Sequence, residues 1–290
     1  MLSGFISGRT KICGIIGDPI EHAMSPVMHN AAFKNKGVDY VYLPFRVEKE
    51  ELGKAIEDMR ALNIRGLNVT IPHKVAVIPF LDELDHLADK IGAINTIVNN
   101  NGVLKGYNTD ATGFLQALVE RGIEPKGKSV VILGAGGASR AISFILAERG
   151  SSLVILNRTW DKAKVCADRI SRTFAREVEA LELNRKNLAK ALEKADILVN
   201  ATSVGMSPNI SETAVTSNLL RPNLVVYDIV SNPIKTRLQR EAEAAGATVI
   251  SGLDMLLWQG ALAFEKWTGL KAPIGVMREE AIKVLQRDED

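Results

Sequence analysis

Short runs of β-branched and aliphatic residues alternate along this chain with longer stretches in which apolar residues recur at helical spacing. The runs that predict strands are 12–17, 40–47, 67–70, 95–98, 103–107, 130–133, 153–156, 197–200, 224–229 and 248–251. The stretches that predict helices include 50–62, 138–149 and 234–245, with two more beginning near 253 and 276. Alternation of this kind is typical of an α/β fold with parallel sheets.

Residues that start and stop elements support several of these boundaries. Ser25 and Pro26 predict an N-cap and the first position of a helix, which Gly37 ends. Asn101 and Gly102 lie between two apolar runs and predict a tight hairpin turn.

The composition is that of an ordinary soluble protein of about two domains. Of 290 residues, 46% are hydrophobic, and 36 Lys and Arg stand against 34 Asp and Glu. This balance excludes a disordered chain and a dedicated nucleic-acid binder. No stretch reaches the roughly 18 apolar residues of a membrane span, and residues 1–17 read as a tail leading into a strand, not as a signal peptide. Cys13 and Cys166 are too far apart in sequence to indicate a disulfide framework or a zinc site. We therefore expect a cytoplasmic protein.

A phosphate-binding P-loop pattern occurs first, with Gly122 followed after four residues by Gly127, Lys128 and Ser129. Such a loop must follow a strand and open a helix, so that backbone N–H groups and the helix dipole face phosphate. Here the expected order is reversed, and Pro125 removes one of the amides. We reject this motif.

A second glycine loop has the correct context. It follows the apolar strand 130–133, spans Gly134, Ala135 and Gly136, and leads into a helix. Glycine at 134 permits the tight turn, and glycine at 136 allows backbone to approach a pyrophosphate. Ser139 takes the third position, where Gly or Ala is usual, and is still small enough for helix–strand packing. The loop predicts a dinucleotide site.

The end of the next strand distinguishes the two nicotinamide cofactors. An acidic residue about 20 positions on would bind the ribose 2′-OH of NAD. This chain instead has Asn157, Arg158 and Thr159, with Lys162 one turn later. These groups suit a 2′-phosphate, so we expect NADP. The Rossmann-type, doubly wound NADP-binding domain is expected over 111–251, and an N-terminal α/β substrate domain over 1–110, to which the chain returns at 252–290 with two helices.

Polar side chains follow the expected strands of the first domain. Thr70 ends the run 67–70 and Lys74 follows it, and Asn95 and Asp110 lie at similar strand-to-loop transitions. Ligands of open α/β sheets bind at the carboxyl ends of strands. A lysine and an aspartate placed there can stabilise and relay the proton that accompanies hydride transfer to a carbonyl.

With these motifs the chain resembles the shikimate dehydrogenase family over nearly its whole length. The segments that carry the resemblance are 17–22 (GDPIEH), 68–74 (NVTIPHK), 92–96 (GAINT), 108–110 (NTD), 134–139 (GAGGAS), 157–159 (NRT), 200–206 (NATSVGM), 252–256 (GLDML) and 259–261 (QGA). The resemblance implies NADPH-dependent reduction of 3-dehydroshikimate to shikimate in the aromatic amino-acid pathway, with a small molecule and neither nucleic acid nor membrane as partner, and a homodimer.

The resemblance also implies residue roles. Lys74 and Asp110 are the expected catalytic pair, converging on one cleft opposite the nicotinamide. The expected substrate-binding residues are Ser25, Thr70, Asn95, Gln259 and Ser231. The expected cofactor-binding residues are Gly134, Ala135, Gly136, Gly137, Ala138, Asn157, Arg158, Thr159, Lys162, Ile229 and Gly252.

Two positions depart from the family pattern. Ala23 stands where the family has the first serine of Ser-x-Ser-Pro, which removes one hydroxyl from a carboxylate-binding pair. A charge-assisted bond of that kind contributes roughly 1.5–3 kcal/mol. Ser231 stands where the family has tyrosine. A quinate/shikimate or aminoshikimate dehydrogenase therefore remains an alternative function, as does a catalytically silent NADP-binding regulator.

The chain has four histidines but no HExxH, and we expect no metal. These histidines are His22, His29, His73 and His86.

Overall fold

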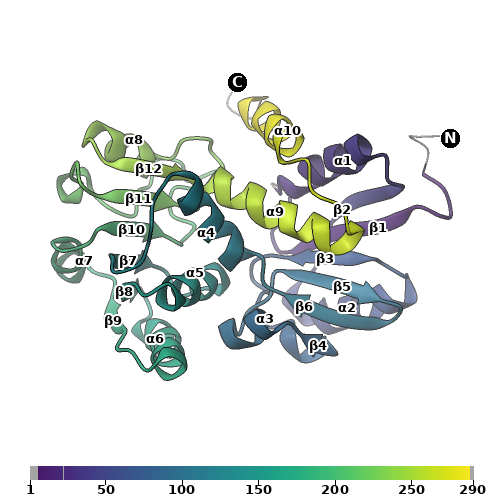
Figure 1. Cartoon of the computed structure of the whole chain (residues 1–290), viewed down its shortest axis with the longest axis horizontal. Helices are drawn as coiled ribbons and strands as arrows, with labels where there is room; N and C mark the ends of the chain where they lie inside the picture. The colour runs from purple at the N-terminus through teal and green to yellow at the C-terminus, as the bar shows by residue number, and fades with distance from the viewer. Residues whose placement is uncertain (1–5, 22, 288–290) are drawn as a thin grey trace. The chain divides into compact units, whose positions relative to one another are not determined.

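The computed structural model describes residues 6–21 and 23–287 and divides into two compact units (Figure 1). The first unit comprises the chain up to Thr109 and again from Leu257 onward. The second is the continuous stretch Asp110–Leu256. The start of the expected N-terminal tail and His22 lie outside the described residues.

The first unit is built on a six-stranded mixed sheet in the order β2-β1-β3-β5-β6-β4. β1, β2 and β3 run parallel, whereas β5 is antiparallel to both β3 and β6. The strands are β1 (Lys11–Gly17), β2 (Tyr40–Arg46), β3 (Gly66–Val69), β4 (Glu83–Leu84), β5 (Thr96–Asn100) and β6 (Val103–Tyr107). The α/β fold is confirmed, but the sheet of this unit is not wholly parallel as the alternation predicts, because the hairpin expected at Asn101 and Gly102 makes β5 and β6 antiparallel.

The turn between β5 and β6 has the backbone conformation expected of an Asn-Gly hairpin. Asn101 and Gly102 have φ values of 55° and 94°, the left-handed conformation that favours Asn-Gly in a two-residue turn. The side chain of Asn99 also accepts a hydrogen bond from the Gly102 N–H at 2.7 Å.

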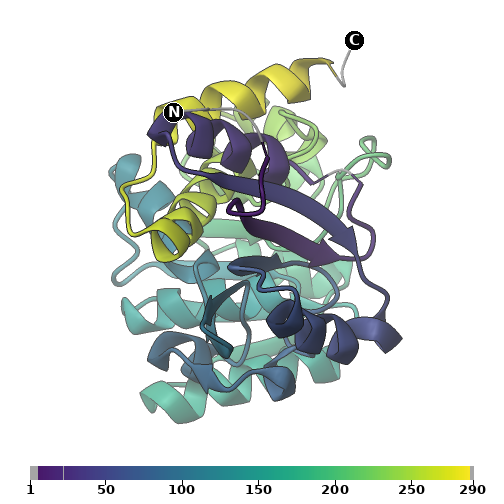
Figure 2. The same cartoon turned by 90° about the vertical axis from the view of Figure 1, so that its right-hand side faces the viewer.

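Helices from both ends of the sequence cover this sheet. They are α1 (Ser25–Lys36), α2 (Leu52–Ala61), α3 (His86–Ile91) and α10 (Ile274–Arg287), with short 3₁₀ turns η1 (Lys49–Glu51) and η2 (Ile78–Phe80). α9 (Gly252–Thr268) enters the unit at Leu257. α1 and α10 pack side by side (Figure 2). The buried Trp267 of α9 donates its indole N–H to the Ile97 carbonyl at 3.0 Å, and Gly66 is required beneath it because an added Cβ would lie 2.0 Å from that indole.

The second unit is a fully parallel six-stranded sheet in the order β12-β11-β10-β7-β8-β9. Its strands are β7 (Ser129–Leu133), β8 (Ser152–Asn157), β9 (Glu179–Glu182), β10 (Ile197–Asn200), β11 (Val225–Asp228) and β12 (Thr248–Ser251). Its helices are α4 (Asp110–Glu120), α5 (Gly137–Glu148), α6 (Trp160–Phe174), α7 (Arg185–Leu192) and α8 (Arg237–Ala244), with the 3₁₀ turn η3 (Ser217–Leu219). With β7 as its first strand, this is the doubly wound 3-2-1-4-5-6 order of dinucleotide-binding domains.

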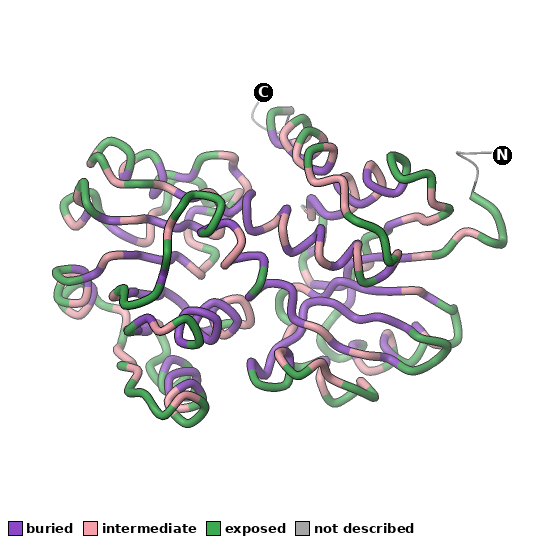
Figure 3. The backbone as a smooth tube through the Cα atoms, in the orientation of Figure 1, coloured by how far each residue is buried: buried purple, intermediate pink, exposed green. Residues whose placement is uncertain are grey.

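Burial explains why this order is stable. β7 and β10 are central and carry apolar residues on both faces, and most of α5 is also buried (Figure 3). Strands covered by helices on both faces are expected to be continuous apolar runs, and residues 130–133 form such a run.

Several expected boundaries differ from the structure. Ser25 is the first helical residue of α1 and Met24 is the N-cap, so the Ser25 side chain is not the helix cap. α8 begins at Arg237 rather than at 234, because Thr236 forms a capping box with Gln239. Among the described residues no helix is long and apolar enough to cross a membrane.

Candidate active site

The first unit gathers buried amides and hydroxyls at the loop between β6 and α4. Asn95, only 2% exposed, accepts a hydrogen bond on Oδ1 from the Thr109 N–H at 2.7 Å. Its Nδ2 donates to Thr109 Oγ1 at 2.9 Å and to Gln259 Oε1 at 3.2 Å. Because a backbone N–H can only donate, the orientation of the Asn95 amide is fixed. Two of the expected substrate residues, Asn95 and Gln259, are therefore in direct contact.

A second group of buried polar residues continues from this cluster. Asn68 Nδ2 donates to the Asn95 carbonyl and to Thr96 Oγ1, both at 3.1 Å. Its Oδ1 accepts from the Tyr42 hydroxyl at 2.7 Å. Burial and the nearby Cys13 raise the pKa of Tyr42, and a hydrogen bond with Ser25 opposes the rise. Ser25, 4% exposed, is thus linked to Asn95 through Tyr42 and Asn68.

Lys74 and Thr70 lie on the turn that follows β3. The Thr70 N–H donates to the Ile16 carbonyl at 2.9 Å, and the Lys74 carbonyl accepts from the Ile94 N–H at 2.8 Å. Gly17 is required beside Thr70, since a Cβ there would lie 2.4 Å from the threonine methyl. These backbone contacts fix the turn and bring residue 74 next to the loop of Asn95.

Asp110 is buried, 3% exposed, and is the first residue of α4. It directly follows Thr109, whose N–H and hydroxyl contact Asn95. The chain passes from the first unit to the second at this peptide bond. The convergence of Lys74 and Asp110 on one cleft stays a prediction.

The glycine loop of the second unit has the geometry of a phosphate cradle. Gly134 has φ of 106°, and a Cβ there would lie 2.7 Å from the Ala201 carbonyl oxygen. Ser139 donates to the Gly134 carbonyl at 2.6 Å, which ties the loop to the first turn of α5.

Space for a ligand remains at the start of α5. Gly136 is the N-cap, and within residues 6–21 and 23–287 no side chain caps the helix and no atom lies within 4 Å of a Cβ built on Gly136. Free backbone N–H groups at a helix N-terminus bind phosphate. The loop Gly134–Ala138 therefore fits a dinucleotide pyrophosphate.

The expected 2′-phosphate site lies at the end of β8. Arg158, Thr159 and Lys162 are all exposed, and Asn157 holds the turn by donating from Nδ2 to the Thr159 carbonyl at 2.9 Å. An exposed guanidinium and ammonium at the strand end, with no acidic residue at 157–159, fit an extra phosphate rather than a ribose hydroxyl pair.

The remaining cofactor residues lie at the ends of β11 and β12. Gly252 packs against backbone so closely that a Cβ would lie 2.4 Å from the Ile229 carbonyl carbon and oxygen. Ser231, half-buried, follows two residues after Ile229 on the same loop. The positions expected to line the nicotinamide pocket are therefore held together by backbone contact.

Two fully buried polar residues at strand ends of this unit were not among the predicted site residues. Asn200 and Asp228 end β10 and β11, lie opposite each other in register and are 0% exposed. The same sequence pattern that indicated the site residues of the first unit, a polar residue at the end of an apolar strand, could have predicted Asn200 and Asp228. Tyr42 carried no comparable signal, because its hydroxyl is indistinguishable in sequence from that of a packing aromatic.

Metal-ligating groups do not gather in the part of the chain that the structure describes: no cluster of three or more His, Cys, Asp or Glu occurs there. His29 and His73 are fully buried, and His73 Nε2 contacts the Val47 carbonyl at 2.7 Å.

The glycine-loop sheet and the separate polar cluster define a two-unit, dinucleotide-dependent oxidoreductase. Three family models match the chain: the shikimate dehydrogenase substrate binding domain at 15–97, the shikimate / quinate 5-dehydrogenase model at 117–249 and the shikimate 5'-dehydrogenase C-terminal domain at 252–282. The chain belongs to the shikimate dehydrogenase family.

Relatives and solved structures agree over nearly the full length. The chain is 48% identical over 276 residues to a shikimate dehydrogenase (NADP(+)) of Dehalococcoides mccartyi, covering 95% of this chain and 96% of the relative. It is 49% identical over 284 residues to that of Methanopyrus kandleri, covering 97% and 98%. A shikimate dehydrogenase crystallised with NADP+ superposes with a TM-score of 0.91 at 43% identity, covering 98% and 99%. Quinate dehydrogenase from Corynebacterium glutamicum, in complex with NAD, superposes with a TM-score of 0.85 at 31% identity, covering 94% and 99%.

Proposed function

We propose that this protein catalyses the reversible, NADPH-dependent reduction of 3-dehydroshikimate to shikimate, a step of aromatic amino-acid biosynthesis. The observation that carries the proposal is the buried contact between Asn95 and Gln259, beside the turn of Lys74. A cluster of amides and hydroxyls suits a small polyhydroxylated ring, because each ring hydroxyl requires both donors and acceptors when water is excluded.

The substrate contacts are assigned to the polar groups of this cluster. Asn95, Gln259 and Thr70 bind ring hydroxyls, and Ser25 binds the carboxylate side of the ring. Ser231 supplies a hydroxyl from the loop after β11. Ala23 offers no hydrogen-bond donor, so the carboxylate is held by fewer donors than in the usual family pattern.

Lys74 and Asp110 perform the proton chemistry. NADPH supplies the hydride when it is bound. The Lys74 ammonium donates to the ketone oxygen and stabilises the developing alkoxide, while Asp110 holds Lys74 and the adjacent substrate hydroxyl. Preorganised donors of this kind are most effective in a site from which water is excluded.

The cofactor is assigned to the second unit. The backbone N–H groups of residues 134–138 bind the pyrophosphate, and Arg158, Thr159 and Lys162 bind the 2′-phosphate, with Asn157 holding their turn. Ile229 and Gly252 line the nicotinamide pocket. The unobstructed N-terminus of α5 and the basic end of β8 support this assignment.

The decisive experiment is steady-state kinetics of the purified protein with shikimate and quinate, each with NADP+ and NAD+, followed by absorbance of the reduced nicotinamide. The proposal expects the highest kcat/KM with shikimate and NADP+. A preference for quinate or for an amino analogue of shikimate supports the alternative that Ala23 and Ser231 accept a modified ring, and the 31% identity to a quinate dehydrogenase favours testing it. Cofactor binding without turnover of any of these substrates indicates an NADP-binding regulator and overturns the enzyme assignment.

We also infer that the protein works in the cytoplasm as a homodimer. Cys13 and Cys166 are both buried and free, as suits a reducing compartment. The homodimer rests on the family resemblance, and light scattering of the purified protein tests it: a single-chain mass at micromolar concentration overturns it.

A further inference from the structure

Asp228, at the carboxyl end of β11, is a buried carboxylate held entirely by hydrogen bonds. Its Oδ1 accepts from Asn200 Nδ2 at 2.9 Å and from the Val230 N–H at 3.2 Å. Its Oδ2 accepts from Thr236 Oγ1 at 2.6 Å. Three donors from three segments therefore converge on one fully buried acidic group.

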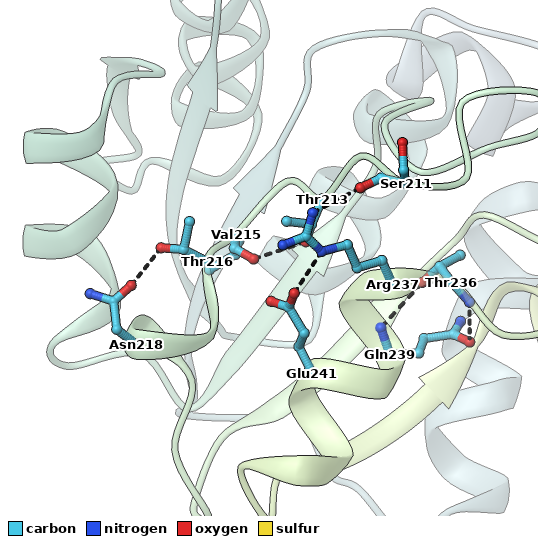
Figure 4. A network of polar contacts seen from close by, with 9 residues as sticks. All are labelled: Ser211, Thr213, Val215, Thr216, Asn218, Thr236, Arg237, Gln239 and Glu241. Atoms are coloured by element: carbon cyan, nitrogen blue, oxygen red, sulfur yellow. Dashed lines mark hydrogen bonds and ion pairs between the residues drawn. The ribbon is translucent and has the colours of Figure 1, made fainter.

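The direction of each of these bonds is fixed by its neighbours. The Thr202 N–H donates to Asn200 Oδ1 at 3.2 Å, so Asn200 must present its Nδ2 to Asp228. Thr236 Oγ1 accepts from the Gln239 N–H at 3.2 Å, so its single proton is available to Asp228 (Figure 4). Because every partner donates, the arrangement is built for an ionised carboxylate.

No Lys, Arg or His contributes to the pKa of Asp228 among the described residues. Burial raises that pKa to about 6, and the bonds from Thr236, Val230 and Asn200 oppose the rise. The groups that face it are Asn200 from β10, Thr236 from the start of α8 and its own Val230 N–H. At neutral pH the Asp228 carboxylate is thus negatively charged and, among the described residues, is stabilised by three hydrogen-bond donors and by no cationic side chain.

Asp228 directly precedes Ile229, which is proposed to line the nicotinamide pocket. The Ile229 N–H, next to Asp228, donates to the Asn200 carbonyl at 3.1 Å. The Ile229 carbonyl abuts Gly252, and Ala201 abuts Gly134 of the phosphate loop. Backbone contacts and hydrogen bonds therefore join the ends of four neighbouring strands, β12, β11, β10 and β7, at the edge of the sheet assigned to the cofactor.

We propose that Asp228 sets the redox preference of this site, its unpaired negative charge favouring the cationic nicotinamide of NADP+ over the neutral ring of NADPH. The inference rests on the proposed function for the place of the nicotinamide beside Ile229. Oxidation of NADPH transfers a hydride from C4 of the nicotinamide to the substrate carbon and leaves one positive charge on the nicotinamide ring. A carboxylate in a low-dielectric interior stabilises that charge and leaves the neutral ring almost unaffected.

The test is binding of each cofactor form in the absence of substrate. NADPH affinity is measured by its fluorescence on binding, and NADP+ affinity by displacement of bound NADPH, at pH 7.5. Asp228→Asn removes the charge and is expected to raise the ratio Kd(NADP+)/Kd(NADPH) by about fivefold. An equal rise in both Kd values overturns the proposal, because a merely structural role moves both.

Asp196→Asn is the matched control. Asp196 precedes β10 at the opposite end of the strand, where its Oδ2 accepts from the Ser129 N–H at 2.8 Å. Its replacement also removes one negative charge from this unit, and the expected Kd ratio is that of the wild type. A ratio that changes as much as in Asp228→Asn overturns the proposal.

A measurement on the unmodified protein covers the case in which Asp228→Asn does not fold. Lowering the pH from 7.5 to 5 protonates Asp228 and is expected to shift the wild-type Kd ratio in the same direction. The 2′-phosphate is common to both cofactor forms, so its own titration cancels in the ratio. A constant ratio overturns the proposal. Lack of turnover with shikimate would instead overturn the proposed function, and the binding ratio would still be measurable.

Discussion

Asn95 Nδ2 and Gln259 Oε1 lie 3.2 Å apart, although 164 positions separate the two residues in sequence. Because the Thr109 N–H fixes which end of the Asn95 amide faces outward, Gln259 must accept through its oxygen. The returning segment of the chain thus supplies a side chain whose orientation is set by Asn95 and Thr109 of the first unit.

Replacing Gln259 is expected to weaken substrate binding selectively. Gln259→Ala removes a proposed hydroxyl contact and the partner of Asn95, so KM for shikimate should rise about tenfold, with KM for NADP+ unchanged. Gln286→Ala, on the exposed side of α10, is the control and should behave as the wild type. An equal rise in both KM values would argue for general damage to the fold.

Lys74→Ala is expected to lower kcat by about a hundredfold or more, because general-acid assistance to the ketone oxygen is lost. NADPH affinity, measured by fluorescence titration, should stay at the wild-type value. Lys36→Ala removes an exposed lysine from the end of α1 and should retain full activity. Turnover retained by Lys74→Ala would refute the catalytic role.

Arg158→Ala is expected to reduce affinity for NADPH by about tenfold, with NADH affinity unchanged, since only NADPH carries the 2′-phosphate. Titration of both cofactors measures this directly. The control is Arg172→Ala, near the far end of the same helix, α6. A parallel loss of NADH binding would place Arg158 elsewhere in the cofactor site.

Gly252→Ala is expected to destabilise the protein by about 1–3 kcal/mol, because the new methyl group meets the Ile229 backbone at 2.4 Å. Gly275→Ala, in α10 with open space around the added carbon, should raise stability by up to about 1 kcal/mol. Urea denaturation of both variants measures the contrast. Similar midpoints for the two would contradict the predicted close approach.

His29 should make the protein sensitive to acid. Burial lowers the pKa of His29 to about 3. Neither ring nitrogen has a hydrogen-bond partner among the described residues, and the ring stacks on Tyr42 with 4.5 Å between the ring centroids. Between pH 6.5 and 3 the unfolded chain binds the proton more tightly, so stability due to this group is complete above pH 6.5 and is lost as pH falls.

His29→Phe keeps an aromatic ring in the stack and removes this titration. The free energy of unfolding, from urea titrations between pH 7.5 and 4.5, should therefore fall less steeply with acid than in the wild type. His86→Asn, at the exposed start of α3, is the control and should keep the wild-type slope. Identical slopes in all three proteins would show that His29 is not the group responsible.

Sequence patterns predicted the central strands of the sheets better than their short edge strands, for physical reasons. β7 and β10 are buried on both faces and are therefore unmistakable apolar runs, and the glycine loop lies between a strand and a helix as its chemistry requires. β9, with the sequence EALE, and the two-residue β4 lie at sheet edges. An edge strand buries little and needs no apolar pattern.

The glycine loop and Arg158 could be proposed as site residues from the sequence, because the local residue types and their order along the chain suffice there, and their roles stay predictions. Contacts that depend on tertiary structure could not be predicted. Nothing local in the sequence pairs Tyr42 with Asn68, or shows that Asn200 and Asp228 lie opposite each other in register. The role expected of Ser25 as a helix cap failed because the helix begins one residue earlier, which leaves its hydroxyl for Tyr42.

Because the chain returns to its first unit at Leu257, the first unit cannot complete its folding until that last segment has been synthesised. The strands of that sheet emerge early, yet Gly66 is matched to Trp267, and α1 packs against α10. Residues 110–256 form a continuous unit and can complete their core while the last helices are still being synthesised. Residues 6–109 are therefore synthesised before residues 110–256 but reach their native packing after them, and until then a chaperone would have to shield the apolar residues that Trp267 and α10 later cover.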